Sequence, residues 1–255
     1  MTSICYNNTM KYENITAAKF INRPNRFIAT VEIDGKLEKA HVKNTGRLGE
    51  LLIEGAQVFL EDHEGRMGTR KLRYSLIGVV KPGGVSDDVM VNIDSQAPNK
   101  VVGEALEEGR LLPCGVEKIT KIIGEYKYGD SRLDFYVEGN AGEKILMEVK
   151  GVTLEVDGMA RFPDAPTQRG IKHIDELISA VTKGKEDHDA KCTGACIVFV
   201  IQMKGVSAFG PNYERHRAFG EALARAGAAG VEILAYDCIA GEDNLEIDRQ
   251  IPVKL

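Results

Sequence analysis

The pattern of hydrophobic residues changes near residue 88, and this change constrains the fold more than any other feature of the sequence. Before it, short runs rich in β-branched and aromatic residues are separated by turn formers at about ten-residue intervals, which is typical of a small barrel or sandwich. Beyond it, helical and strand periodicities alternate, which indicates an α/β (α+β) arrangement around a mixed sheet. Residues 82–88 combine turn formers with charge, so we expect one domain over residues 1–84 and another over residues 85–255.

The first third of the chain is expected to contain five strands. Asp34-Gly35 is a strong signal for a two-residue hairpin between two of them. A five-stranded barrel of the OB type fits this number and size best. The expected strands span residues 26–33, 36–43, 56–60, 71–80 and 89–93.

The second domain is expected to place helices on a mixed sheet. The continuous apolar run at residues 196–201 predicts a strand that is covered on both faces. The expected helices span residues 97–108, 168–182 and 212–228, and the other expected strands span residues 130–138, 144–150 and 231–236.

Two acidic residues and a lysine are spaced so that they can meet on a pair of strands. Side chains alternate between the faces of a strand, so Glu148 and Lys150 share one face. If the strands flanking the turn at residues 139–142 pair with each other, Asp134 can approach Glu148. Glu125, just upstream, could supply a further carboxylate.

This grouping matches the needs of phosphodiester hydrolysis. Asp134 and Glu148 offer the oxygen ligands that Mg²⁺ or Mn²⁺ prefers, and the metal acidifies a water. Lys150 could orient that water and balance charge. The candidate catalytic residues are therefore Glu125, Asp134, Glu148 and Lys150. The alternative is that Glu148 and Lys150 are polar residues on an exposed strand, because an E-x-K tripeptide alone is weak evidence.

The net charge of −5 is unevenly distributed. Residues 1–88 hold 13 Lys and Arg against 11 Asp and Glu, a net charge of +2, and the remainder holds 20 against 27. Nucleic-acid binding depends on the local field and not on the total charge. An acidic total therefore permits DNA binding on a confined patch.

Three groups of basic residues could form such a patch. They are Arg23, Arg26, Lys43 and Arg47; Arg70, Lys71 and Arg73; and Arg169, Lys172 and His173. The second group could equally be a solvated face. The third could equally be the outer face of a helix that Thr167 caps. Phe27 begins an expected strand, so we expect it in the core and not stacked on a base.

The remaining composition favours a cytoplasmic protein. Five cysteines without a dense framework indicate reduced thiols, and the lone Cys192-x3-Cys196 spacing does not favour zinc. No apolar run reaches the roughly 18–20 residues that cross a bilayer, and the N-terminus lacks the apolar core of a signal peptide. We therefore expect no membrane partner.

Several motifs together are more specific than any one of them. In chain order they are Arg23-Pro-Asn-Arg-Phe27, Asn44-Thr-Gly46, Lys71-Leu-Arg-Tyr74, Asp94 with Pro98-Asn99, Glu125-x-Lys-Tyr-Gly129, Ser131-Arg-x-Asp-Phe135, Glu148-Val-Lys-x-Val-Thr153 and Phe162-Pro-Asp-Ala-x-Thr-x-Arg-Gly-x-Lys-His173. This set resembles the sugar fermentation stimulation protein A family of bacteria and archaea over almost the whole chain.

The resemblance implies an N-terminal OB-like domain and a C-terminal domain similar to PD-(D/E)xK nucleases. Asp134, Glu148 and Lys150 match the nuclease motif, and Glu125 fits its upstream acidic position. The resemblance also implies DNA binding without sequence preference and a regulatory link to sugar (maltose) metabolism.

Three functions stay open. The first is a DNA-binding protein that retains a divalent-metal centre, and the second is an active Mg²⁺-dependent nuclease on structured or single-stranded nucleic acid. The third is a sugar- or protein-binding regulator that uses the fold as a scaffold, because OB barrels also bind oligosaccharides and proteins.

Overall fold

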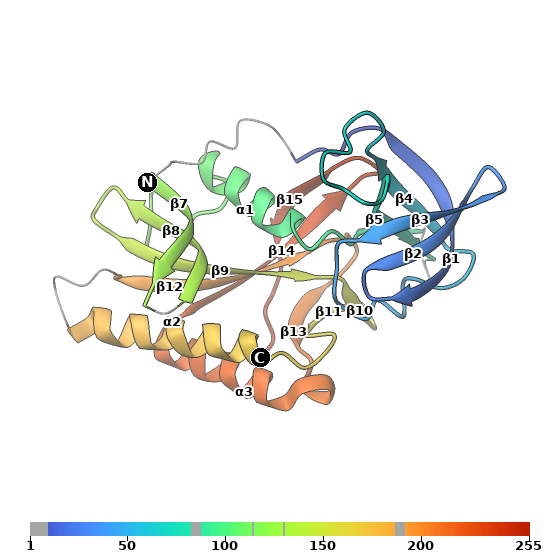
Figure 1. The fold of residues 1–255 in the computed structure, drawn as a ribbon. Coiled ribbons are helices and arrows are strands. Elements are labelled where there is room, and N and C mark those ends of the chain that lie inside the picture. Colours follow the sequence, from blue (N-terminus) through green and yellow to red (C-terminus); the bar gives the residue numbers. More distant parts are fainter. Residues whose placement is uncertain (1–9, 83–87, 114, 130, 187–191) are drawn as a thin grey trace.

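The computed structural model describes residues 10–82, 88–113, 115–129, 131–186 and 192–255, which form a barrel and a larger α/β part (Figure 1). The expected boundary between residues 84 and 85 lies outside the described residues. None of the helices in the described ranges has the length and hydropathy of a membrane span.

The first part is a closed five-stranded barrel, which confirms the predicted OB-like fold. Its strands are β1 (Ile15–Asn25), β2 (Ile28–Ile33), β3 (Lys36–Val42), β4 (Gln57–Asp62) and β5 (Tyr74–Lys81). Antiparallel pairing joins β3, β2, β1, β4 and β5 in that order. Parallel pairing of residues 40–42 with residues 74–76 then closes the ring. The closed ring removes the unpaired edges of an open sheet.

The barrel uses a different set of five strands from the expected one. The chain already enters it at β1, where the buried side chains of Ala18 and Phe20 alternate with polar ones. This alternation is weak, and the strand ends in Asn and Pro residues that are typical of turns. The strand expected at residues 89–93 is β6 (Val89–Asn92), which lies outside the ring and pairs with β5.

The second part is built on a mixed sheet, as predicted, but the sheet has six strands where four were expected. The sheet order is β15-β14-β12-β9-β8-β7, in which β9, β12 and β14 are parallel and the other pairings are antiparallel. Its strands are β7 (Ile119–Tyr128), β8 (Ser131–Gly139), β9 (Lys144–Val152), β12 (Gly194–Ile201), β14 (Glu232–Ala240) and β15 (Leu245–Gln250). A small sheet of β10 (Leu154–Val156), β11 (Met159–Phe162) and β13 (Ala208–Pro211) continues from the end of β9.

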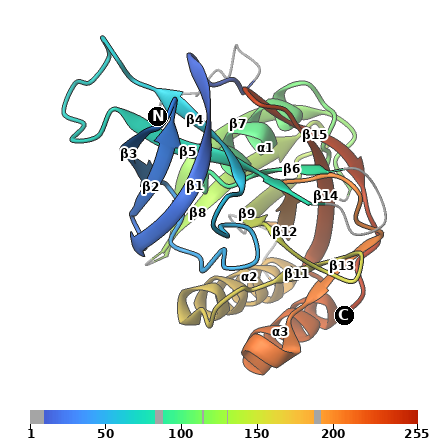
Figure 2. The same cartoon turned by 90° about the vertical axis from the view of Figure 1, so that its right-hand side faces the viewer.

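Helices cover both faces of the large sheet (Figures 1 and 2). They are α1 (Ala97–Glu107) on one face, and α2 (Gln168–Glu186) and α3 (Tyr213–Ala229) on the other. As a result β12 is buried from residue 195 to residue 201, as its apolar sequence predicts. Thr167 caps α2 by accepting the N–H of Gly170 at 3.0 Å, and Asn212 caps α3 by accepting that of Arg215 at 3.2 Å.

Gln202 joins the two parts at the end of β12. It is 1% exposed, and its Nε2 donates to Asn92 Oδ1 and to the carbonyl of Asp94, both at 3.0 Å. Its own carbonyl accepts the N–H of Asn92 at 2.9 Å, and its N–H donates to the carbonyl of Val152. One buried side chain therefore ties the segment that leaves the barrel to the central strands of the sheet.

Phe27 lies on the surface, so the expectation of a core position is wrong. Its side chain is 47% exposed, and the Arg26 guanidinium lies 5.3 Å from the ring centre. The cause is that residues 26 and 27 form the tight turn between β1 and β2, where the side chains project away from the barrel.

The cysteines within the described ranges are buried. They are Cys192, Cys196 and Cys238. Burial of Cys196 in β12 agrees with the apolar run that it opens. Cys5 and Cys114 lie outside the described residues.

Arg23 holds the barrel loops, and its expected role in phosphate binding stays a prediction. Its two terminal nitrogens donate hydrogen bonds of 2.6–3.0 Å to four backbone carbonyls, those of Arg26, Asn44, Gly46 and Arg47. These bonds occupy all four terminal N–H groups of the guanidinium. The cation therefore fixes the β1–β2 turn against the loop after β3.

Replacing Arg23 by methionine is expected to lower the free energy of unfolding by about 2–4 kcal/mol, because the carbonyls lose a charged donor. The matched control is Arg26→Met, whose exposed side chain should change stability by less than about 0.5 kcal/mol. Urea denaturation followed by circular dichroism measures both. Equal stability of the two variants would contradict the loop-fixing role.

Candidate functional site

The two predicted metal ligands lie where β8 and β9 separate. The ladder between these strands ends at the pair Phe135 and Met147. Asp134 is the next residue, and its Oδ2 accepts the N–H of Val149 at 2.8 Å. In a continued ladder this N–H of β9 would donate to a backbone carbonyl of β8. Here the Asp134 carboxylate accepts it instead. This position brings Asp134 close enough to Glu148 for their charges to interact.

Glu148 is buried in the middle of the sheet, with 3% of its surface exposed. Its Oε1 accepts hydrogen bonds from Lys150 Nζ and from His173 Nδ1. Its Oε2 is buried and has no hydrogen-bond partner among the described residues. A buried carboxylate oxygen without a partner is costly, so this atom is suited to a ligand that the protein itself does not provide.

The two carboxyl groups differ in their electrostatic surroundings. Burial, and next the negative charge of Glu148, raise the pKa of Asp134 to about 6, although Val149 N–H and Asn99 donate to its oxygens. Burial acts to raise the pKa of Glu148 as well, but the hydrogen bonds and charges of His173 and Lys150 lower it overall. Carboxyl neighbours with separated pKa values are a common feature of active sites.

His173 contacts Glu148, and its expected role as a phosphate contact stays a prediction. The side chain is buried in α2, and its Nε2 accepts from Arg169 Nε at 3.4 Å. Since Arg169 can only donate, Nδ1 carries the proton and donates to Glu148. The sequence contained a signal for this position, because His173 lies four and seven residues before the buried Leu177 and Ala180.

Asn99 is a site residue whose role was not predicted. It lies in α1, and its Nδ2 donates to Asp134 Oδ1 at 2.7 Å. The sequence separation of 35 residues explains the omission, because no local spacing relates α1 to β8. Asp134 is therefore held by a helix on one side and a strand on the other.

Glu125 is not brought into this cluster. Its neighbours in β7 pair with the residues on either side of Asp134, so its backbone lies level with the site. Its side chain, however, is 62% exposed and forms an ion pair with Arg132 at 3.6 Å. Its φ of 54° is unusual for a residue other than glycine. The role of Glu125 in catalysis stays a prediction.

Three of the remaining basic candidates form ion pairs within the protein. Lys43 Nζ lies 3.1 Å from Asp94 and 3.6 Å from Glu61, and only 13% of its side chain is exposed. Arg73 forms an ion pair with Asp62 at 2.5 Å, and Lys172 forms one with Glu176 at 3.7 Å, but both of these cations are exposed. The candidates on the exposed surface are Arg26, Arg47, Arg70, Lys71, Arg73, Arg169 and Lys172.

Two family models match the chain in succession. The SfsA N-terminal OB domain matches residues 21–93, and the sugar fermentation stimulation protein RE domain matches residues 96–244. The chain is 51% identical to a sugar fermentation stimulation protein homolog of Clostridium beijerinckii over 96% of this chain and 100% of that protein. It is 50% identical to the homolog of Desulfitobacterium hafniense over 96% and 99% of the two chains.

A solved structure has the same architecture. The structure of Pyrococcus furiosus SfsA in complex with Ca²⁺ matches with a TM-score of 0.80 and 30% sequence identity. The match covers 96% of this chain and 98% of that chain. The shared fold therefore includes both the barrel and the α/β part.

Replacing His173 by leucine is expected to lower the free energy of unfolding by about 1–3 kcal/mol at pH 8, because a buried carboxylate loses a donor. The neighbouring exposed Lys172 provides the control, and Lys172→Leu should change stability by less than about 0.5 kcal/mol. Urea denaturation measures both. In the Glu148→Gln background the effect of His173→Leu should shrink, and an unchanged effect would show that the two side chains are not coupled.

Proposed function

The chain belongs to the sugar fermentation stimulation protein family, and we propose that it binds DNA and hydrolyses phosphodiester bonds with the help of a divalent metal ion. The observation that carries the proposal is the convergence of Asp134, Glu148 and Lys150 where β8 and β9 separate. Two carboxylates and an amine at one buried position match the chemical needs of phosphodiester hydrolysis.

The residues present fit Mg²⁺ or Mn²⁺. Asp134 and Glu148 would hold the ion, which would polarise a phosphate and acidify a water. Within the described ranges, no group of three or more His, Cys, Asp or Glu side chains could hold a metal. Water and phosphate oxygens would therefore complete the coordination, as is usual for Mg²⁺ bound by one or two carboxylates. The Ca²⁺ complex of the Pyrococcus furiosus relative supports a hard cation in this family.

The surrounding side chains position the reacting groups. Asn99 and the N–H of Val149 fix the Asp134 carboxylate, and His173 fixes that of Glu148. Lys150, with 18% of its side chain exposed, can turn towards solvent and offer its ammonium to a phosphate or to the attacking water. These groups come from α1, β8, β9 and α2, so the site depends on the packing of both faces of the sheet.

DNA binding would rest on the exposed cations. Arg26 and Arg47 lie on the barrel, and Arg169 and Lys172 lie on α2 beside the carboxylates. Contacts to phosphates carry no sequence information directly, which fits binding without sequence preference. The exposed Phe27 ring under Arg26 adds a surface on which a base could stack.

Lys150→Ala is expected to reduce the rate of Mg²⁺- or Mn²⁺-dependent DNA cleavage by about 100-fold or more, because it removes charge stabilisation at the reacting phosphate. The control is Lys183→Ala, which alters an exposed lysine at the far end of α2 and should leave the rate unchanged. Single-stranded, flapped and paired oligonucleotides are incubated with each protein and separated on denaturing gels.

Two outcomes would contradict the proposal. Equal cleavage by the wild type and Lys150→Ala would assign the activity to a contaminant. Absence of cleavage, together with no retention of DNA in a gel shift at low salt, would favour the regulator that uses this fold as a scaffold.

The affinity for Mn²⁺ is expected to fall as the pH is lowered through about 6, the pKa of Asp134. The ion and the proton compete for this carboxylate, so the affinity should fall about tenfold per pH unit below that value. Isothermal titration calorimetry at pH 5, 6 and 7.5 measures the trend. Asp134→Asn should bind weakly at every pH. A wild-type affinity that is constant from pH 5 to 7.5 would exclude Asp134 as a ligand.

A further inference from the structure

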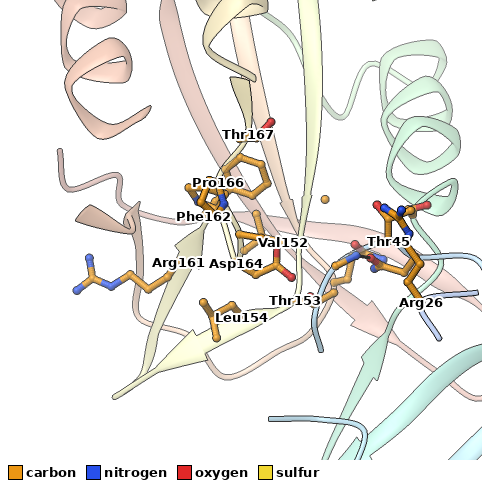
Figure 3. A pocket seen from close by; sticks show the side chains of 17 residues that line it. Arg26, Thr45, Val152, Thr153, Leu154, Arg161, Phe162, Asp164, Pro166 and Thr167 are labelled. Atoms are coloured by element: carbon orange, nitrogen blue, oxygen red, sulfur yellow. Dashed lines mark hydrogen bonds between the residues drawn. The ribbon is translucent and has the colours of Figure 1, made fainter. Parts of the chain in front are cut away.

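A pocket of about 460 Å³ lies between the barrel and the α/β part (Figure 3). The barrel contributes Arg26 and the loop at residues 44–46. The other side contributes residues 151–154 and residues 161–167. Val152 in the pocket wall lies two residues after Lys150 and on the same face of β9, about 6.6 Å along the strand. A nucleotide whose phosphate reaches Lys150 could thus place its own base, or the adjacent one, in the pocket.

The apolar side chains of the pocket lining lie on one of its sides. Figure 3 shows the side chains of Phe162, Pro166 and Val152 gathered there together with Asp164, with Thr45 and Arg26 opposite. The Phe162 ring is held by Phe199 and Phe219, with centroid distances of 5.7 and 5.1 Å. A rigid apolar wall with a few convergent polar groups is typical of a pocket for a small planar group.

Asp164 determines which part of a nucleotide fits. Its Oδ2 accepts the N–H of Arg47 at 2.9 Å, which ties it to the barrel loop. A Cβ atom at Gly46 would lie only 2.5 Å from this oxygen, so glycine is required for the close approach. A carboxylate repels phosphate, whereas it accepts hydrogen bonds from the exocyclic amino groups of bases, as it does from cytosine N4.

We propose that this pocket binds an unpaired nucleobase close to the reacting phosphate. A base that is stacked and paired within a duplex cannot enter a pocket, so the preferred substrate is a nucleic acid with a single-stranded or bulged nucleotide. The inference rests on the proposed function and names its substrate class. Phe27, exposed at the rim beside Arg26, would stack on the following base.

The test compares three DNA probes that differ only at one position. They are a duplex with a single bulged cytosine, the same duplex with a bulged thymine, and the fully paired duplex. Binding is measured by fluorescence anisotropy in Ca²⁺. The wild type is expected to bind the bulged cytosine about tenfold more tightly than the paired duplex, and also more tightly than the bulged thymine.

Two variants address the pocket, and a third serves as the control. Thr45→Trp fills the pocket from an exposed loop, so the ratio between bulged and paired affinities should fall to about one. Asp164→Asn should remove the preference for cytosine over thymine. The control is Thr182→Trp, at an exposed position near the far end of α2, which should keep the wild-type ratio. Circular dichroism confirms that each variant is folded.

The inference is overturned if the wild type binds bulged and paired probes equally, or if Thr45→Trp retains the preference. Tight binding of a maltooligosaccharide that Thr45→Trp abolishes would also overturn it. If the wild type then still cleaves paired DNA and Lys150→Ala does not, only the pocket assignment fails. If the preference for the bulge holds without any cleavage, only hydrolysis fails.

Discussion

The site depends on the burial of two carboxylates beside each other in the middle of a sheet. Taking two like charges out of water is unfavourable unless each one is paired or hydrogen-bonded. Here one carboxyl group receives hydrogen bonds from Asn99 and the β9 backbone, and the other from His173 and Lys150. These hydrogen bonds do not fully offset the unfavourable free energy of burying the two charges. The pKa of Asp134 is raised, and one oxygen of Glu148 has no partner among the described residues. A divalent cation bound as proposed would neutralise the two charges and give that oxygen a partner.

The hairpin that carries the site could be predicted because its information is local. Strand alternation places Glu148 and Lys150 on one face, and a short turn brings Asp134 opposite them. Asn99 and His173 were assigned no such role, because they come from helices whose packing depends on contacts far apart in the sequence. The same limit applies to the basic residues. Arg23 and Lys43 are cations of the kind that line DNA-binding surfaces, but they donate hydrogen bonds to a carbonyl and a carboxylate that are distant in the sequence.

The fold shows a similar division between local and distant information. Long apolar strands such as β12 and well-capped helices such as α3 were predictable, because a continuous apolar run or a cap acts within a few residues. Besides the three short strands of the small sheet, the missed strands are β1, β7 and β15. These three are partly exposed and contain many polar residues, and they become strands by pairing with a neighbour. The fifth predicted barrel strand is real as β6, but it lies outside the ring, where it pairs with β5.

Gln202 has a consequence for the mechanics of the molecule. Its hydrogen bonds connect β12 and β9 to the segment through which the chain leaves the barrel. A hinge motion between the barrel and the α/β part would have to break several buried hydrogen bonds at once. Opening and closing of the two parts around a ligand is therefore unfavourable. The pocket between the barrel and the α/β part should therefore keep a fixed width. A ligand would enter according to its own thickness and flexibility, so the ligand and not the protein would have to change conformation.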